Sequence, residues 1–201
     1  MAHHLRFAGA SAAQQLAALK GIIADEPLLM DVLRRLRALA QADSWLVSGA
    51  IYNTVWNVLT ARPPQTGIRD IDIFYWDDSD LSYEAEDTVI KRGDAIFASV
   101  PLPVQIRNQA RVHLWYEAHF GQPYPPLRSS REAVDRFAST THAVAARLEA
   151  DDRIDIYAPY GLDDLFSFRI APNRSMDNSR THMEKGARAL SVWPEVTLIP
   201  W

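Results

Sequence analysis

The chain has 201 residues, a formal net charge of −4 and no cysteine, and 48% of its residues are apolar. It is long enough to bury a core, and without cysteine it can form neither disulfides nor thiolate metal sites. The negative charge argues weakly against broad binding to nucleic acid, which needs many cationic contacts. Residues 1–10 carry no secretion signal, and no segment approaches the roughly 18 apolar residues of a membrane span. We therefore expect a cytoplasmic protein that does not associate with membranes.

Two helices are predicted near the start of the chain. Residues 11–24 repeat their leucines and isoleucines at helical spacing, and Ser11 is suited to be the N-cap. Residues 28–40 repeat the pattern, with Pro27 suited to a first helical position and Asp25 as a candidate cap.

A strand, a turn and a helix follow. The apolar residues 45–47 predict a buried strand, Ser48 and Gly49 form a small-residue turn, and residues 50–60 have helical spacing. The prolines at positions 63 and 64 end this helix, because proline lacks the N–H group that would continue it. The start of a helix offers N–H groups and a positive dipole to a phosphate, so this turn is a candidate phosphate cradle.

The next strand, predicted over residues 68–76, contains two aspartates. Asp70 and Asp72 are two positions apart, so their side chains share one side of the strand, roughly 7 Å apart along the backbone. Two carboxylates so placed repel each other unless a cation lies between them. A hard divalent ion such as Mg²⁺ or Mn²⁺ takes carboxylate oxygens, and such a pair beside a phosphate cradle indicates metal-assisted phosphoryl transfer.

Three more elements are predicted up to residue 120. They are a helix over residues 81–99, a short strand over 104–106 and a helix over 108–120. Arg111 in the last of these could hold a triphosphate, because a guanidinium group matches phosphate oxygens in pairs.

The rest of the chain predicts a pair of strands and a cationic last helix. Residues 140–149 and 153–157 read as paired strands, and a short helix and a short strand follow them. In the last helix, over residues 178–192, Lys185 and Arg188 are three positions apart and share one side. They either line a groove that receives a polyanion or only solvate the surface.

Several motifs together carry a resemblance. They are SGAIYN at positions 48–53, DIDIFY at 70–75, NQARVHLWYE at 108–117, APYGLDDL at 158–165 and the Trp-Pro pair at 193–194. In these motifs the chain resembles the DNA polymerase β type nucleotidyltransferase superfamily. Within it, the chain is most similar to a bacterial nucleotidyltransferase-like family, an uncharacterised branch of small proteins.

The resemblance implies an α+β fold, with a mixed sheet flanked by helices and further helices at the N-terminus. The length of the chain fits a single domain, over residues 1–201. The parts of this domain would be an N-terminal helical part over 1–43, a core over 44–120, and C-terminal strands and a helix over 121–201.

The resemblance also implies a third carboxylate on the strand over residues 104–106, and Gln105 stands there instead. Glutamine is neutral and cannot act as a base. Asp155 could substitute for the missing carboxylate, or it could simply face solvent. The candidate catalytic residues are therefore Asp70, Asp72 and Asp155. The first two are also the metal ligands, and the nucleotide contacts are Ser48, Gly49, Asn53, Arg111 and Lys185.

Three functions follow from this reading. The first is a metal-dependent nucleotidyltransferase that moves a nucleoside monophosphate from a nucleoside triphosphate to an unknown acceptor, with Mg²⁺ or Mn²⁺ as cofactor. The second, favoured by Gln105, is a catalytically impaired module on the same fold that binds a nucleotide or a protein partner. The third is a metal-dependent phosphodiesterase that uses the same carboxylates.

Overall fold

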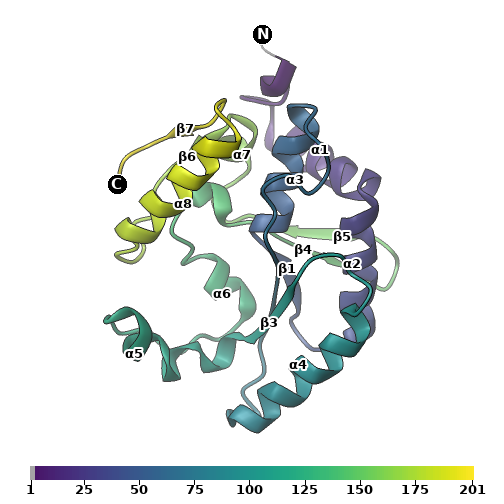
Figure 1. Cartoon of the computed structure of the whole chain (residues 1–201), viewed down its shortest axis with the longest axis vertical. Coiled ribbons are helices and arrows are strands. Elements are labelled where there is room, and N and C mark those ends of the chain that lie inside the picture. The colour runs from purple at the N-terminus through teal and green to yellow at the C-terminus, as the bar shows by residue number, and fades with distance from the viewer. Residues whose placement is uncertain (1–2) are drawn as a thin grey trace.

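The computed structural model describes residues 3–201, in which a mixed β-sheet is flanked by helices (Figure 1). The strands of this sheet lie in the order β3-β2-β1-β4-β5. Only β2 and β3 are parallel; the other neighbours are antiparallel. The strands are β1 (Trp45–Val47), β2 (Ile71–Tyr75), β3 (Val104–Asn108), β4 (Ala145–Leu148) and β5 (Ile154–Tyr157). The predicted α+β class with a mixed sheet is confirmed.

The helices lie on both faces of this sheet, and a small second sheet lies near the C-terminus (Figure 1). The α-helices are α1 (Ala12–Asp25), α2 (Pro27–Leu39), α3 (Gly49–Leu59), α4 (Tyr83–Phe97), α5 (Tyr116–Phe120), α6 (Ser130–Val134), α7 (Asp163–Phe166) and α8 (Ser179–Val192). The 3-10 helices are η1 (His3–Leu5), η2 (Gln109–Leu114) and η3 (Thr140–His142). The second sheet pairs β6 (Arg169–Ile170) with β7 (Thr197–Leu198) in parallel.

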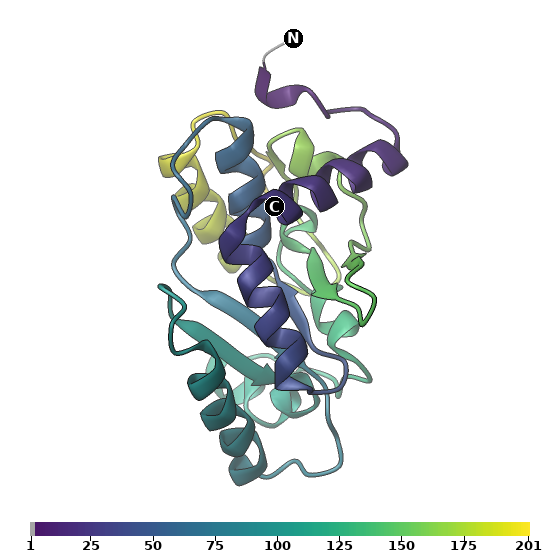
Figure 2. The same ribbon diagram turned by 90° about the vertical axis from the view of Figure 1, so that its right-hand side faces the viewer.

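The two faces of the main sheet bury different cores. On β2, Ile71, Ile73 and Tyr75 enter the larger core, which α1, α2 and α3 help to fill. Figure 2 shows α2 crossing this face in front of the strands. The opposite face carries a smaller cluster around Trp45 and Val47. Asp72 belongs to this second face, because side chains alternate along a strand.

The N-terminal helices follow their sequence signals closely. Ser11 caps α1, accepting a hydrogen bond from the N–H of Gln14, whose own side chain bonds back to Ser11. Pro27 is the first residue of α2, as predicted. Asp25 is not its cap, because α1 runs through Asp25 and Glu26 occupies the cap position without a side-chain hydrogen bond.

Two predicted elements are divided in the structure. The helix expected over residues 108–120 is a 3-10 turn, η2, followed by α5, because the Asn108 side chain accepts from the N–H of Ala110 and tightens the first turn. The strand expected over residues 140–149 begins only at Ala145. Before it, η3 is held by the hydroxyl of Thr141, which donates to the carbonyl of Arg169.

Within residues 3–201, no helix has both the length and the apolar character needed to cross a membrane.

His142, at the end of η3, is a buried polar residue under the first turns of α3. Its ring stacks on Tyr52 with the centroids 4.6 Å apart, and neither ring nitrogen has a hydrogen-bond partner among residues 3–201. Burial holds the pKa of His142 well below its usual value, and the nearby charge of Lys185 acts in the same direction. The folded protein therefore keeps this imidazole neutral.

This burial predicts a loss of stability in acid. Below about pH 6.5 the unfolded chain binds a proton at His142 that the folded chain excludes, so the free energy of unfolding falls with pH by up to about 1.4 kcal/mol per unit. Urea unfolding of His142→Leu across this range should show a shallower fall than the wild type. His119→Leu, at an exposed position, is the control and should keep the wild-type slope. Equal slopes for wild type and His142→Leu would contradict the assignment.

Candidate functional site

The turn between β1 and α3 has a conformation that serine rarely adopts. Ser48 has φ 56° and ψ −110°, a left-handed backbone that favours glycine. Its N–H donates to the carbonyl of Val144 at 2.8 Å, and its own carbonyl accepts from Ile51 and Tyr52. This bend redirects the chain immediately after β1, so α3 begins at Gly49 with its first N–H groups at the end of the sheet where β1 stops and β2 starts.

The two aspartates lie next to this turn because of strand pairing. In the antiparallel register of β1 and β2, Val47 is opposite Asp72, so the residue after Val47 meets the start of β2. Asp70 lies just before β2, which begins at Ile71 rather than at the predicted residue 68. Asp70, Asp72, Ser48 and Gly49 all line one cavity of about 380 Å³. The predicted meeting of the turn and the carboxylates is therefore present.

The opposite wall of this cavity comes from α8. Lys185 and Arg188 line the cavity from this helix, and Trp193, which follows the helix, lines it as well. The Asn53 side chain lines the cavity and donates to the carbonyl of Gly67 at 3.3 Å, so it holds the segment that leads to Asp70. Of the predicted nucleotide contacts, Ser48, Gly49, Asn53 and Lys185 share this cavity.

The charges in the cavity influence one another. Burial, together with the neighbouring charge of Asp70, raises the pKa of Asp72 to about 6, and the charges of Lys185 and Arg107 oppose this rise. Lys185 keeps contact with solvent inside the cavity, but the protein atoms around it lower the pKa of its ammonium group; Asp72 raises that pKa in part. A cation placed between the carboxylates would favour their charged forms.

Gln105 occupies the place where the resemblance implies a third carboxylate. In the parallel register of β2 and β3 it is the partner of Asp72. Its amide nitrogen donates to Oδ2 of Asp70 at 2.8 Å. A neutral side chain therefore binds one oxygen of the carboxylate pair.

The structure does not bring Asp155 to the site. Asp155 lies on β5, on the same sheet face as Asp72 but three strands away, which is about 14 Å at the usual strand spacing. Its Oδ2 is 3.4 Å from a guanidinium nitrogen of Arg147 and 3.6 Å from one of Arg131. The expectation that Asp155 replaces the third carboxylate is wrong, because strand order separates it from the pair.

Arg111 is also engaged elsewhere. It forms an ion pair with Glu86, in which both side chains are largely buried, and its Nε donates to the carbonyl of Leu81 at 2.9 Å. The other Glu86 oxygen accepts from the N–H of Asn108. Arg111 thus joins η2 to α4 and does not line the cavity, so its expected role as a triphosphate contact is not supported by its position.

Several cavity residues were not expected from the sequence. Arg69 and Tyr52 line the cavity, and Arg107 influences Asp72. Arg107 could have been found, because it is two positions after Gln105 and so shares its side of β3. Tyr52 precedes Asn53 on α3, but helical spacing alone does not tell which of two adjacent residues faces a ligand.

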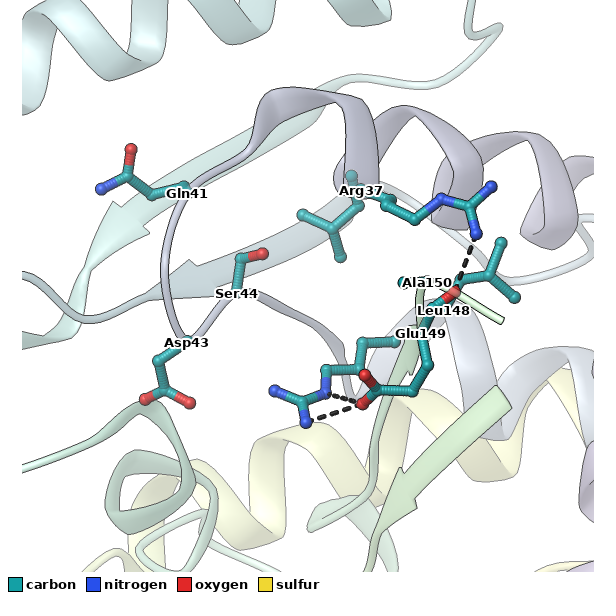
Figure 3. Close-up of a pocket in the computed structure, with 9 residues that line it drawn as sticks. Arg37, Gln41, Asp43, Ser44, Leu148, Glu149 and Ala150 are labelled. Carbon is teal, nitrogen blue, oxygen red and sulfur yellow. Dashed lines mark hydrogen bonds and ion pairs between the residues drawn. The ribbon is translucent and has the colours of Figure 1, made fainter. Parts of the chain in front are cut away.

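A second hollow lies at the far end of α2 and is lined by residues of α2, the following loop and β4 (Figure 3). Arg37 donates there to the carbonyl of Glu149 at 2.8 Å, and the Glu149 carboxylate accepts from Arg147 (Figure 3). These groups satisfy one another, and the predicted site residues lie elsewhere. The cavity between the β1–α3 turn and α8 is therefore the candidate site.

Known proteins are similar to this chain in sequence and in fold. A family model described as nucleotidyltransferase matches residues 34–198. A solved structure described as the NMR structure of a protein that reveals a CCA-adding enzyme head domain superimposes with a TM-score of 0.72 and 25% sequence identity. The match covers 92% of this chain and 96% of that one. No curated protein matches the chain.

The backbone at Ser48 predicts that glycine would stabilise the fold. Relief of a left-handed conformation gains about 1–3 kcal/mol, against about 0.5–1 kcal/mol for the greater freedom of glycine in the unfolded chain. Ser48→Gly should therefore raise the free energy of unfolding by about 1 kcal/mol in urea titrations. Ser48→Ala keeps the Cβ atom and should give no such gain. A stability for Ser48→Gly at or below that of Ser48→Ala would rule out strain at this turn.

The buried ion pair predicts an asymmetric response to mutation. Arg111→Met leaves the Glu86 carboxylate buried without a cation and should cost about 3–5 kcal/mol of unfolding free energy. Adding Glu86→Gln removes the charge but keeps an acceptor for the N–H of Asn108, so the double variant should recover most of the loss. Urea unfolding measures the stability of both variants. If the double variant is no more stable than Arg111→Met, the ion pair between Arg111 and Glu86 is not what stabilises this region.

Proposed function

Because the chain belongs to the nucleotidyltransferase family, which it matches over residues 34–198, we propose that it transfers a nucleoside monophosphate from a nucleoside triphosphate to an acceptor. One observation carries this proposal. The start of α3, the carboxylates of Asp70 and Asp72 at the start of β2, and two cations from α8 line the same cavity. This is the set of groups that the binding and reaction of a polyphosphate requires.

The residues of the cavity suit a divalent cation. Asp70 and Asp72 supply the carboxylate oxygens that Mg²⁺ or Mn²⁺ prefers, and the burial and mutual repulsion that raise the pKa of Asp72 are relieved by a positive ion. When bound, the ion would neutralise charge that develops on the phosphate oxygens. We therefore assign Asp70 and Asp72 as the residues that would hold it.

The other groups position the triphosphate. The N–H group of Gly49, at the positive end of α3, binds a phosphate oxygen, whereas that of Ser48 is already donated to the carbonyl of Val144. Lys185 and Arg188 balance the remaining negative charge from the opposite wall. Tyr52 and Trp193 supply aromatic surface to the lining of the cavity.

A binding module without turnover is the second candidate function. Gln105 favours it, because an amide in place of a carboxylate can neither carry the charge nor act as a base. The two candidates share the nucleotide-binding step and differ only in whether pyrophosphate is released.

The proposal predicts that binding of the Mg²⁺ complex of ATP depends on the carboxylate pair. The Asp70→Asn, Asp72→Asn double variant should bind at least about 100-fold more weakly in isothermal titration calorimetry, because it has lost both charged ligands. Asp155→Asn makes the same chemical change outside the cavity and should bind like the wild type. Equal heats for wild type and double variant would remove the proposed site.

Turnover is then measured as pyrophosphate released from labelled triphosphates with a mixed acceptor pool. The pool includes RNA 3′ ends, because the structural neighbour is described as a CCA-adding enzyme head domain. Binding with release identifies the transferase, and binding without release identifies the binding module.

A further inference from the structure

The neutral side chain of Gln105 affects how many metal ions the cavity can hold. We propose that the cavity holds a single divalent ion, brought in with the triphosphate, and that the ammonium group of Lys185 takes the place of a second ion. The proposal rests on the proposed function, because it describes the charges around the same bound triphosphate.

The first argument is the number of carboxylates. Among residues 3–201 no group of three or more histidine, aspartate or glutamate side chains is placed to hold a metal ion. Asp70 and Asp72 are a pair, and Gln105 already occupies Oδ2 of Asp70. Two ions about 4 Å apart need shared carboxylates between them, whereas one Mg²⁺ is commonly held by one or two carboxylates and the substrate phosphates.

The second argument is the position of Gln105. The β2–β3 register places it beside Asp72, and its hydrogen bond fixes it against Asp70. It lies on an exposed edge strand, so no packing requirement selects an amide there. A glutamate at this position would complete a three-carboxylate site without a change in the fold.

The third argument is the charge that faces the carboxylates. Lys185 lines the same cavity from α8, and Arg188 lies one turn further on the same side of that helix. A fixed positive charge at this place repels a second divalent ion and attracts the triphosphate.

The stoichiometry of Mn²⁺ binding tests the proposal directly. Purified protein is saturated with a non-hydrolysable ATP analogue, and bound Mn²⁺ is counted by equilibrium dialysis and by electron paramagnetic resonance, with the nucleotide alone as the blank. We expect about one Mn²⁺ per protein and a spectrum without coupling between two ions. Protein without the analogue should bind Mn²⁺ at least about tenfold more weakly, because the phosphates supply part of the ligand set.

Variants then separate the two residues. Gln105→Glu should admit a second, magnetically coupled Mn²⁺, and adding Lys185→Met should tighten that second ion at least about tenfold by removing the repulsion. Gln65→Glu adds the same charge at an exposed residue that does not line the cavity and should keep one ion. Thermal unfolding of each variant confirms that it is folded.

The outcomes distinguish this proposal from the one on which it rests. Two Mn²⁺ ions in the wild-type complex would overturn the single-ion proposal and leave the transferase proposal intact. One ion in Gln105→Glu would overturn the role given to Gln105. No Mn²⁺ and no analogue bound to the wild type would overturn both.

Discussion

The antiparallel pairing of β1 with β2 is the constraint on which the site depends. It places Val47 opposite Asp72, so a chain that bends directly after Val47 must put its next helix beside the carboxylates. The bend lies at Ser48, whose backbone conformation favours glycine. The Ser48 N–H donates to the carbonyl of Val144 and so joins the bend to the segment before β4. If β1 and β2 slipped by one residue, the carboxylate of Asp72 would turn into the apolar core.

A set of amide hydrogen bonds keeps α3 and the carboxylates in place relative to each other. Asn57 on α3 donates to the carbonyl of Thr66 and accepts from the indole N–H of Trp193. The ring of Trp193 lies so close to Gly67 that a Cβ atom there would be 2.3 Å from it. The loop before Asp70 is therefore fixed between α3 and Trp193. A fixed loop can hold the two like charges of Asp70 and Asp72 near each other.

Local sequence signals predicted those parts of the site that lie within a few residues of one another. The strand, turn and helix over residues 45–60 and the aspartate pair are each visible in the spacing of residues, and the structure brings them together. Asp155 and Arg111 could not be placed in this way. The order of the strands separates Asp155 on β5 from β2. Arg111 forms an ion pair with the buried Glu86, which lies 25 residues earlier in the sequence. Both outcomes depend on long-range packing that periodicity does not contain.

The C-terminal helix α8 covers the carboxylate pair at the start of β2, and together they form a cavity lined by both negative and positive side chains. Gly186 lets α8 pack closely on β7, because a Cβ atom at this position would be 2.4 Å from a methyl group of Leu198. Close packing on one side of the helix directs Lys185 and Arg188 towards Asp70 and Asp72 on another. The cations are thus supplied by a rigid, anchored helix rather than by a loop. Such an arrangement fixes their charge before any triphosphate arrives, and fixed charge is more effective than charge that must reorganise on binding.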